Sequence, residues 1–246
     1  MQEKSKKLFE KIFKESKDDP NIIGFWLDGS MGKGMVTKKS DYDLAMVVRD
    51  GLGNKYRKRY KFQHVSGVDI KILSFSEFEK YAEWGSNTSW DRYNFAHLKT
   101  LIDKNGKIQK LINEKGIIPR NKIKIFIDTS LDAYINRVYR SFKCLRDKND
   151  IAGKLEAAES IFHLLDALFA LEGRIRPYHK YLFFELEKFP LKEIPFGKNF
   201  LKNILEILET GNRKMQKEML KKVKEIFKRN GYGQVINSWD GYFELI

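Results

Sequence analysis

Short apolar runs of strand length characterise the first part of the chain, and polar turns separate them. Residues 22–27 form an apolar run of strand length, and residues 43–48 are apolar after the first residue, which is typical of a buried strand. We expect another strand over residues 68–73. We also expect a strand over residues 56–65, joined to the next run by a hairpin turn at residues 66–67. These runs predict a small sheet within an α/β domain.

Helical periodicity frames this predicted sheet. Residues 3–17 form an amphipathic pattern that places Leu8, Ile12 and Phe13 on one face. Ser76 is a suitable N-cap for a helix that begins at Glu77. We therefore expect helices to cover the sheet.

The pattern changes near residue 120, where the chain becomes helical. Glycines and prolines separate five segments with helical periodicity, which are residues 128–146, 151–172, 178–188, 198–210 and 212–230. The predicted class is α+β, with an N-terminal α/β domain on a small mixed sheet and a C-terminal α-helical bundle. We place the domains at 1–120 and 121–246.

Composition narrows the protein class. Hydrophobic residues make up 42% of the 246 residues, as in globular proteins. No apolar run approaches the roughly 20 residues of a membrane span, so we expect no membrane association. Cys144 is the sole cysteine, which excludes an intrachain disulfide and favours the cytoplasm. The net charge of +14 favours anionic partners, although solvated lysines explain it equally well.

The candidate chemistry lies between the first two predicted strands. The turn at Gly29-Ser30 offers backbone N–H groups and a hydroxyl, which can hold phosphate oxygens. Asp41 and Asp43 follow at alternate positions, and alternate residues of a strand point to one face. Two neighbouring carboxylates repel each other unless a cation lies between them, and Mg²⁺ prefers such ligands together with phosphates.

Gly-Ser followed by Asp-x-Asp resembles the signature of the DNA polymerase β-like nucleotidyltransferase superfamily. In this family two carboxylates hold two metal ions, and a third carboxylate lies on a later strand of the same sheet. Asp69, a lone acid in an apolar run, matches that third position. The resemblance therefore implies two Mg²⁺ ions held by Asp41, Asp43 and Asp69, with Asp69 on the side of the acceptor hydroxyl and often its base.

The resemblance also implies a nucleoside triphosphate as substrate. The expected nucleotide-binding residues are Gly29, Ser30, Ser40 and Lys33. The whole chain resembles the aminoglycoside and lincosamide nucleotidyltransferases in its layout of a catalytic domain followed by a helical bundle. That similarity implies ATP as donor and a hydroxyl of a small antibiotic as acceptor.

Three acids are candidates for binding this acceptor. Asp91 lies in an aromatic segment, where the helix dipole is an alternative reason for an acid. Glu159 and Asp166 belong to a polar stripe on a predicted helix, which is more often a solvated face. Residues 173–181 carry cations and tyrosines that can bind phosphate or stack on a base, or simply connect two helices.

Other acceptors remain open at this stage. A transferase acting on an RNA end fits the positive charge, but the sequence contains no recognisable RNA-binding module. A transferase acting on a protein partner, and a catalytically inactive binding module, are further alternatives. The sequence does not indicate the oligomeric state.

Overall fold

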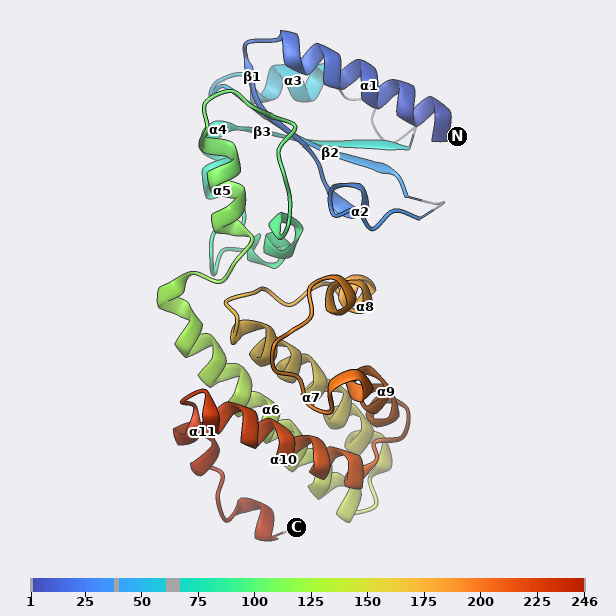
Figure 1. The fold of residues 1–246 in the computed structure, drawn as a ribbon, viewed down its shortest axis with the longest axis vertical. Helices are drawn as coiled ribbons and strands as arrows, with labels where there is room; N and C mark the ends of the chain where they lie inside the picture. The colour runs from blue at the N-terminus through green and yellow to red at the C-terminus, as the bar shows by residue number, and fades with distance from the viewer. Residues whose placement is uncertain (1, 38–39, 61–66, 246) are drawn as a thin grey trace. The chain divides into compact units, whose positions relative to one another are not determined.

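The computed structural model describes residues 2–37, 40–60 and 67–245 (Figure 1). The chain divides into two compact units. Unit 1 comprises residues 1–118 together with Pro177–Phe184, and unit 2 comprises Pro119–Arg176 and Glu185–Ile246. The sequence division had assigned Pro177–Phe184 to the helical part. As a division into domains, the boundary after residue 120 stays a prediction.

Unit 1 is built on the expected small mixed sheet. Its strands are β1 (Ile22–Leu27), β2 (Tyr42–Val48), β3 (Val68–Ser74) and β4 (Ile102–Asp103), in the order β3-β2-β1-β4. Strand β1 pairs antiparallel with β2 and β4, whereas β2 and β3 are parallel. The fold class predicted from the sequence is confirmed, since a helical part follows this domain.

Two apolar layers cover the two faces of this sheet. The helices of unit 1 are α1 (Gln2–Asp18), α2 (Gly29–Gly32), α3 (Gly53–Arg59), α4 (Phe75–Lys80), the 3₁₀ helix η2 (Ser89–Phe95) and α5 (Lys107–Lys115). Helices α1 and α3 contribute to one buried cluster, which contains Ile12 from the predicted apolar face of α1 and Tyr56 from α3. Helices α4, η2 and α5 contribute to the other, around Trp26 and Phe78.

The prediction of a strand over residues 56–65 is wrong for the part that the structure describes. Residues Gly53–Arg59 form helix α3, while residues 61–66 lie outside the described ranges. The predicted hairpin turn at residues 66–67 would have joined that strand to residues 68–73, and it falls partly outside the described residues. In the described ranges, β3 pairs in parallel with β2. Tyr56 and Tyr60 are both buried, and their separation of four residues is the spacing of one helix face.

The predicted N-cap at Ser76 is also wrong, by two residues. Helix α4 begins at Phe75, and Ser74 caps it in a capping box with Glu77. Ser76 instead donates a hydrogen bond from its hydroxyl to Asp50. Serine was the correct type of N-cap residue, but Ser74 and Ser76 are equally suitable from the local sequence.

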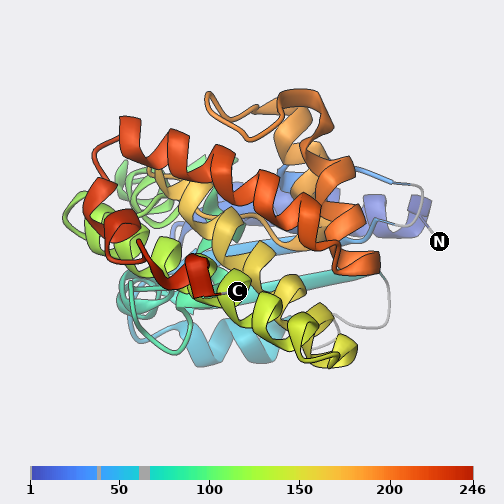
Figure 2. The same cartoon turned by 90° about the horizontal axis from the view of Figure 1, so that it is seen from below.

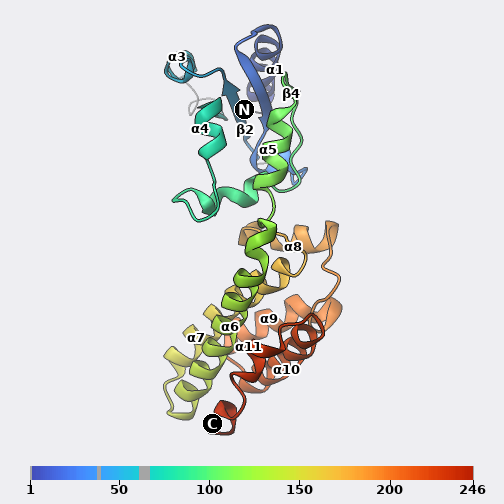
Figure 3. The ribbon, with the colours of Figure 1, turned by 90° about the vertical axis from the view of Figure 1, so that its left-hand side faces the viewer.

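Unit 2 is the expected set of helices. Its longer helices are α6 (Ile123–Arg146), α7 (Asp150–Ala170), α9 (Phe200–Thr210), α10 (Arg213–Arg229) and α11 (Gly233–Asn237). Helix α7 packs along α6, while α9 packs against α7 and α10 against both α6 and α9 (Figures 2 and 3). Helix α8 (His179–Lys188) begins among residues of unit 1 and ends among those of unit 2. Within the described ranges, no helix has the length and apolar character that a membrane crossing requires.

Candidate active site

Three acidic side chains meet at one edge of the sheet in unit 1. Asp43 in β2 and Asp69 in β3 are direct partners in the parallel register, so they lie side by side on one face. Asp28 follows the antiparallel strand β1 at the same edge, and its backbone N–H donates to the carbonyl of Asp43 at 2.7 Å. All three acids line one cavity.

Gly29 allows the chain to pass close to this acidic edge. Its φ of +54° lies in the left-handed region, which only glycine adopts without strain. A Cβ atom added at this position would lie 2.3 Å from Asp43 Oδ2. The turn can therefore lie this close to the Asp43 carboxylate only with glycine at position 29.

Asp43 lies among other carboxylates at the strand ends, and its surroundings shift its pKa. Burial is the largest cause that raises the pKa of Asp43, and the nearby carboxylates of Asp69 and Asp41 raise it further. The Lys180 ammonium opposes this increase. Crowded carboxylates of this kind are favourable only when a cation or a bound ligand compensates them.

The loop after α2 brings two of the predicted phosphate ligands together. Ser30 donates a hydrogen bond from its hydroxyl to Ser40 Oγ at 3.0 Å, and the backbone N–H of Thr37 donates to the same oxygen at 2.8 Å. Ser30 and Ser40 line a second cavity of about 550 Å³ together with Asp41. The serines selected from the sequence thus share one wall of a cavity that reaches the carboxylates.

The two cavities meet at a common set of side chains. The smaller one has a volume of about 240 Å³ and is lined by Asp69, and the larger one is lined by Asp41. Asp43, Lys180 and Tyr181 line both. The carboxylate of Asp43 therefore lies at the junction of two spaces, each large enough for part of a substrate.

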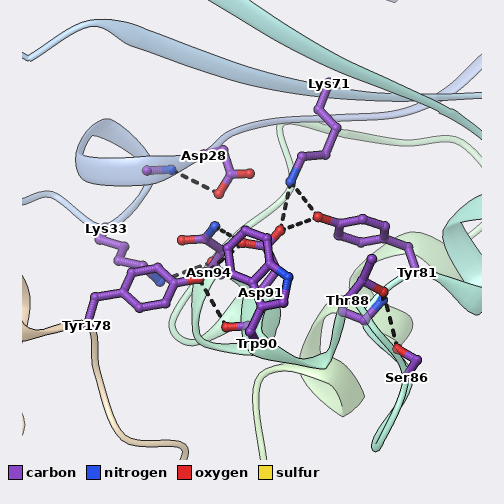
Figure 4. Close-up of polar contacts among 12 residues, drawn as sticks. Asp28, Lys33, Lys71, Tyr81, Ser86, Thr88, Trp90, Asp91, Asn94 and Tyr178 are labelled. Carbon is purple, nitrogen blue, oxygen red and sulfur yellow. Dashed lines mark hydrogen bonds and ion pairs between the residues drawn. The ribbon is translucent and has the colours of Figure 1, made fainter.

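A buried polar network lies beside the smaller cavity (Figure 4). Lys71 forms an ion pair with Asp91 at 2.8 Å and donates to the Tyr81 hydroxyl at 3.1 Å. Burial lowers the pKa of Lys71, but the hydrogen bond and charge of Asp91 outweigh it, and the net shift is upward. Lys71 therefore stays protonated in a partly buried position.

Asp91 is the centre of this network rather than an available ligand for an acceptor. Its side chain is buried, and besides Lys71 it accepts hydrogen bonds from Tyr81 Oη at 2.5 Å, from Tyr178 Oη at 3.1 Å and from the Asn94 amide. Both carboxylate oxygens are therefore occupied. The predicted acceptor-binding role of Asp91 is not supported by this arrangement, because four protein groups already compensate the charge.

Lys33 has a structural environment that differs from the predicted one. The residue is 4% exposed, and its ammonium donates to the backbone carbonyls of Tyr93, Asn94 and Ala96 at 2.9, 3.0 and 2.6 Å. Three acceptors use all three N–H bonds of an ammonium. Lys33 thus ties the turn after α2 to the end of η2, and we remove it from the nucleotide-binding set.

Glu159 and Asp166 lie on helix α7 in unit 2, whereas both cavities are lined by residues of unit 1. Glu159 pairs with Arg137 at 3.0 Å, and Asp166 pairs with Arg176 at 2.6 Å. These ion pairs account for the acidic stripe within unit 2 itself. An acceptor-binding role for the two acids stays a prediction.

The segment Pro177–Phe184 supplies cavity residues that the sequence indicated only weakly. Tyr178, Lys180 and Tyr181 line the smaller cavity, and Tyr178 and Tyr181 both pack against Tyr93. Burial raises the pKa of Tyr178, and Asp91 raises it further, so its hydroxyl remains a hydrogen-bond donor. The sequence showed cations and tyrosines clustered here, but it did not show that they belong to unit 1.

The acidic edge is chemically suited to a divalent cation. Among the described residues, no three acidic, histidine or cysteine side chains converge closely enough to enclose an ion by themselves. Mg²⁺ usually keeps several waters and takes only one or two carboxylates plus substrate phosphates. Asp43 and Asp69 supply such a pair, and Gly29 lets the backbone turn lie directly against the Asp43 carboxylate. The donor set therefore fits a magnesium ion bound together with a substrate.

Comparisons with known proteins identify the family of the chain. The profile of the "Nucleotidyltransferase domain" family matches residues 6–129. A solved structure, a nucleotidyltransferase-like protein from Exiguobacterium sibiricum 255-15, is similar with a TM-score of 0.45 and 10% identity, over 92% of this chain and 76% of that one. No curated protein sequence matches the chain. The family profile covers half of the chain, including the acids at the strand ends, but not the cavity residues Tyr178, Lys180 and Tyr181. The chain therefore belongs to the nucleotidyltransferase domain family, whose general activity is nucleotidyl transfer.

Proposed function

We propose that the protein transfers a nucleoside monophosphate, AMP from ATP, to a hydroxyl group of a small molecule in a Mg²⁺-dependent reaction. The observation that carries this proposal is the pairing of Asp43 with Asp69 beside Gly29. Two carboxylates in register, next to a backbone turn that no side chain blocks, are the minimum that a metal-assisted phosphoryl reaction requires.

Each acid has a role that follows from its place. Asp43 and Asp41 would hold Mg²⁺ on the nucleotide side, and Asp43 with Asp69 would hold it on the acceptor side. Bound Mg²⁺ supplies positive charge that offsets the charge developing on phosphate oxygens. Because Asp69 lines the smaller cavity, we assign it the role of accepting the proton of the attacking hydroxyl.

Suitable partners for the triphosphate are the backbone turn at Gly29, which borders the smaller cavity, and the serines that line the larger cavity. Gly29 and Ser30 begin helix α2, and Ser40 is hydrogen-bonded to Ser30. Lys180 borders both cavities and acts electrostatically on Asp43. We assign it the contact with the triphosphate that the sequence analysis had given to Lys33, because the Lys33 ammonium is occupied by carbonyls.

Aminoglycosides and lincosamides are the first acceptors to test, since the layout of the chain resembles the enzymes that modify them. An RNA end is the second candidate, and one observation favours it, namely the net charge of +14. Binding to RNA would weaken steeply as the salt concentration rises, whereas transfer to a small uncharged hydroxyl compound would not.

The test is pyrophosphate release from the four nucleoside triphosphates with Mg²⁺, across panels of aminoglycosides, lincosamides and short RNAs. We expect ATP with one small-molecule panel to give acceptor-dependent release. Release that depends only on RNA would replace the first candidate with the second.

A matched pair of variants makes the result specific to the site. Asp43→Asn should abolish release without unfolding the protein, because it removes a metal-binding charge from a crowded cluster. Asp18→Asn removes the same charge at the exposed end of α1 and should leave release unchanged. Equal activity of both variants would contradict the proposed metal site.

A further inference from the structure

The two cavities differ in which functional groups they contain. Ser30, Ser40 and Asp41 line only the larger cavity, whereas Asp69 lines only the smaller one. Under the proposed function, the first set serves the nucleotide and Asp69 serves the acceptor. The smaller cavity is then the acceptor side, and its remaining polar residues become candidates for acceptor recognition.

Asp28 lines this cavity, and the hydrogen bonds within the protein involve only one of its two carboxylate oxygens. It is 7% exposed, and its Oδ1 accepts a hydrogen bond from the backbone N–H of Gly29 at 2.9 Å. Among the described residues, no group donates to the other oxygen, Oδ2. Asp28 nevertheless lines the cavity, so this second oxygen is the part of the side chain that a bound molecule can reach.

Nearby cations do not neutralise Asp28 by direct contact. Lys71 and Lys33 are close enough to influence it electrostatically. However, the Lys71 ammonium is bonded to Asp91 and Tyr81, and the Lys33 ammonium is bonded to three carbonyls. A buried carboxylate oxygen without a donor is costly, whereas the same oxygen with a donor from a ligand is strongly stabilising.

We propose that Asp28 is a specificity-determining residue that accepts a hydrogen bond from a hydroxyl or protonated amine of the acceptor, next to the hydroxyl that reacts beside Asp69. This inference rests on the proposed function, because that function defines the acceptor side. It adds a recognition contact to the metal-binding acids, and it gives the cavity a defined preference for acceptors with two neighbouring polar hydrogens.

The size of the cavity limits what enters it. Its volume of about 240 Å³ is below the roughly 300 Å³ at which pockets for drug-sized ligands begin. A single hydroxylated ring, or the end of a larger molecule, fits this space. The acceptor class is therefore a polyol or amino alcohol that presents one small ring or end group.

The alternative role of Asp28 is purely structural, as the N-cap of the short helix α2. Asp28→Ser separates the two roles. Serine is as good an N-cap as aspartate, so it can still accept the Gly29 N–H, but it is uncharged and too short to reach the cavity. Asp28→Asn is the second variant, because it retains the length of the side chain and removes only the charge.

The experiment measures binding by calorimetry to the full chain in Mg²⁺. The probes are a non-hydrolysable ATP analogue alone and then, with that analogue saturating, 2-deoxystreptamine as an amino cyclitol and myo-inositol as a polyol. We expect one of the two rings to bind the wild type, and Asp28→Ser to weaken it at least tenfold. We expect the affinity for the ATP analogue to change less than twofold.

The pattern over the variants identifies the acceptor group. Loss of binding in both variants indicates a protonated amine on Asp28, whereas loss in Asp28→Ser with retention in Asp28→Asn indicates a hydroxyl. The proposal is overturned if neither ring binds the wild type, if Asp28→Ser binds the ring as the wild type does, or if it loses the ATP analogue. Failure of the wild type to bind the ATP analogue is a different result and contradicts the proposed function itself.

Discussion

Two groups of acids in unit 1 have opposite electrostatic environments. Asp43 lies beside Asp69, and burial and this neighbour both raise its pKa. Asp91 is buried, at 1% exposure, yet a lysine, two tyrosines and an amide compensate it. The first group keeps its charge exposed to a cavity, and the second has its charge fully satisfied by the protein.

This difference separates function from stability. A satisfied buried acid rigidifies its surroundings, and its removal leaves partners unpaired. A cluster of acids without compensation costs stability and is retained only when a ligand or metal ion completes it. We therefore expect substitutions in the first group to affect chemistry, and substitutions in the second to affect folding.

The largest expected effect is on the chemical step. Asp69→Asn should lower the rate of pyrophosphate release about 10³-fold, since acid–base groups contribute 10²–10⁴. The affinity for an ATP analogue should change less than fivefold, because Asp69 lines only the acceptor-side cavity. Steady-state kinetics and calorimetry on the same preparation check both. An equal loss of nucleotide affinity would show that Asp69 serves the nucleotide instead.

The next effect is on stability and concerns Asp91. Asp91→Asn should lower the free energy of unfolding by about 2 kcal/mol, because it leaves the Lys71 ammonium without its ion pair. The value is below the 3–5 kcal/mol typical of fully buried pairs since Lys71 is 35% exposed.

Urea denaturation measures this effect, with Asp147→Asn as the control. Asp147 pairs with Arg146 on the surface, where solvent screens the pair, so its loss should change the free energy of unfolding far less than the loss of Asp91. Similar losses in the two variants would contradict the view that Asp91 is a structural centre.

Gly29 and Gly51 separate the effect of backbone strain from the effect of contact with Asp43. Both glycines have a left-handed backbone conformation, but only Gly29 lies against Asp43. Both have positive φ, at +54° and +79°, so alanine at either position should cost about 1 kcal/mol of stability. A Cβ at Gly29 also meets Asp43, whereas nothing lies within 4 Å at Gly51. Only Gly29→Ala should lose activity, by tenfold or more, in the pyrophosphate assay. Loss in both variants would mean that strain alone impairs the enzyme.

The smallest expected effect concerns Glu77, a surface acid whose charge is balanced by an ion pair with Arg57. Arg57 is the main cause that lowers the pKa of Glu77, to about 2, so Glu77 stabilises the fold above its ordinary pKa of 4.5 and loses this contribution as the pH falls toward 2. Glu77→Gln should cost about 0.5 kcal/mol at pH 7 and progressively less below pH 4.5. Urea denaturation at both pH values checks this, with the exposed Glu79→Gln as control. A pH-independent cost would assign the effect to the capping box alone.

Local spacing was sufficient to predict much of the acidic edge. Asp41 and Asp43 are separated by one residue, so period-two alternation predicted that they share one face. Asp69 was selected because it matches the third carboxylate of the superfamily that the sequence resembles. The sheet strands around these acids were predictable from their apolar runs. Their functional roles stay predictions until metal and nucleotide binding are measured.

Long-range partners explain what the sequence did not reveal. Lys33 is a loop lysine in the sequence, but carbonyls about sixty positions away hold its ammonium. The hydroxyl of Tyr178 meets Asp91 across 87 positions. A strand was predicted from residue 56, where the structure has helix α3, because the local pattern does not show that β2 and β3 pair directly in parallel. Such contacts follow from the fold and have no local signature.

The most direct test of the central claim is the binding of a non-hydrolysable ATP analogue with and without Mg²⁺, measured by calorimetry on the wild type and on Asp43→Asn. The account predicts that the wild type binds at least tenfold more tightly with Mg²⁺, and that Asp43→Asn loses this gain while remaining folded. Binding that is equal with and without Mg²⁺, or that Asp43→Asn retains in full, would contradict a metal site formed at the paired strand ends.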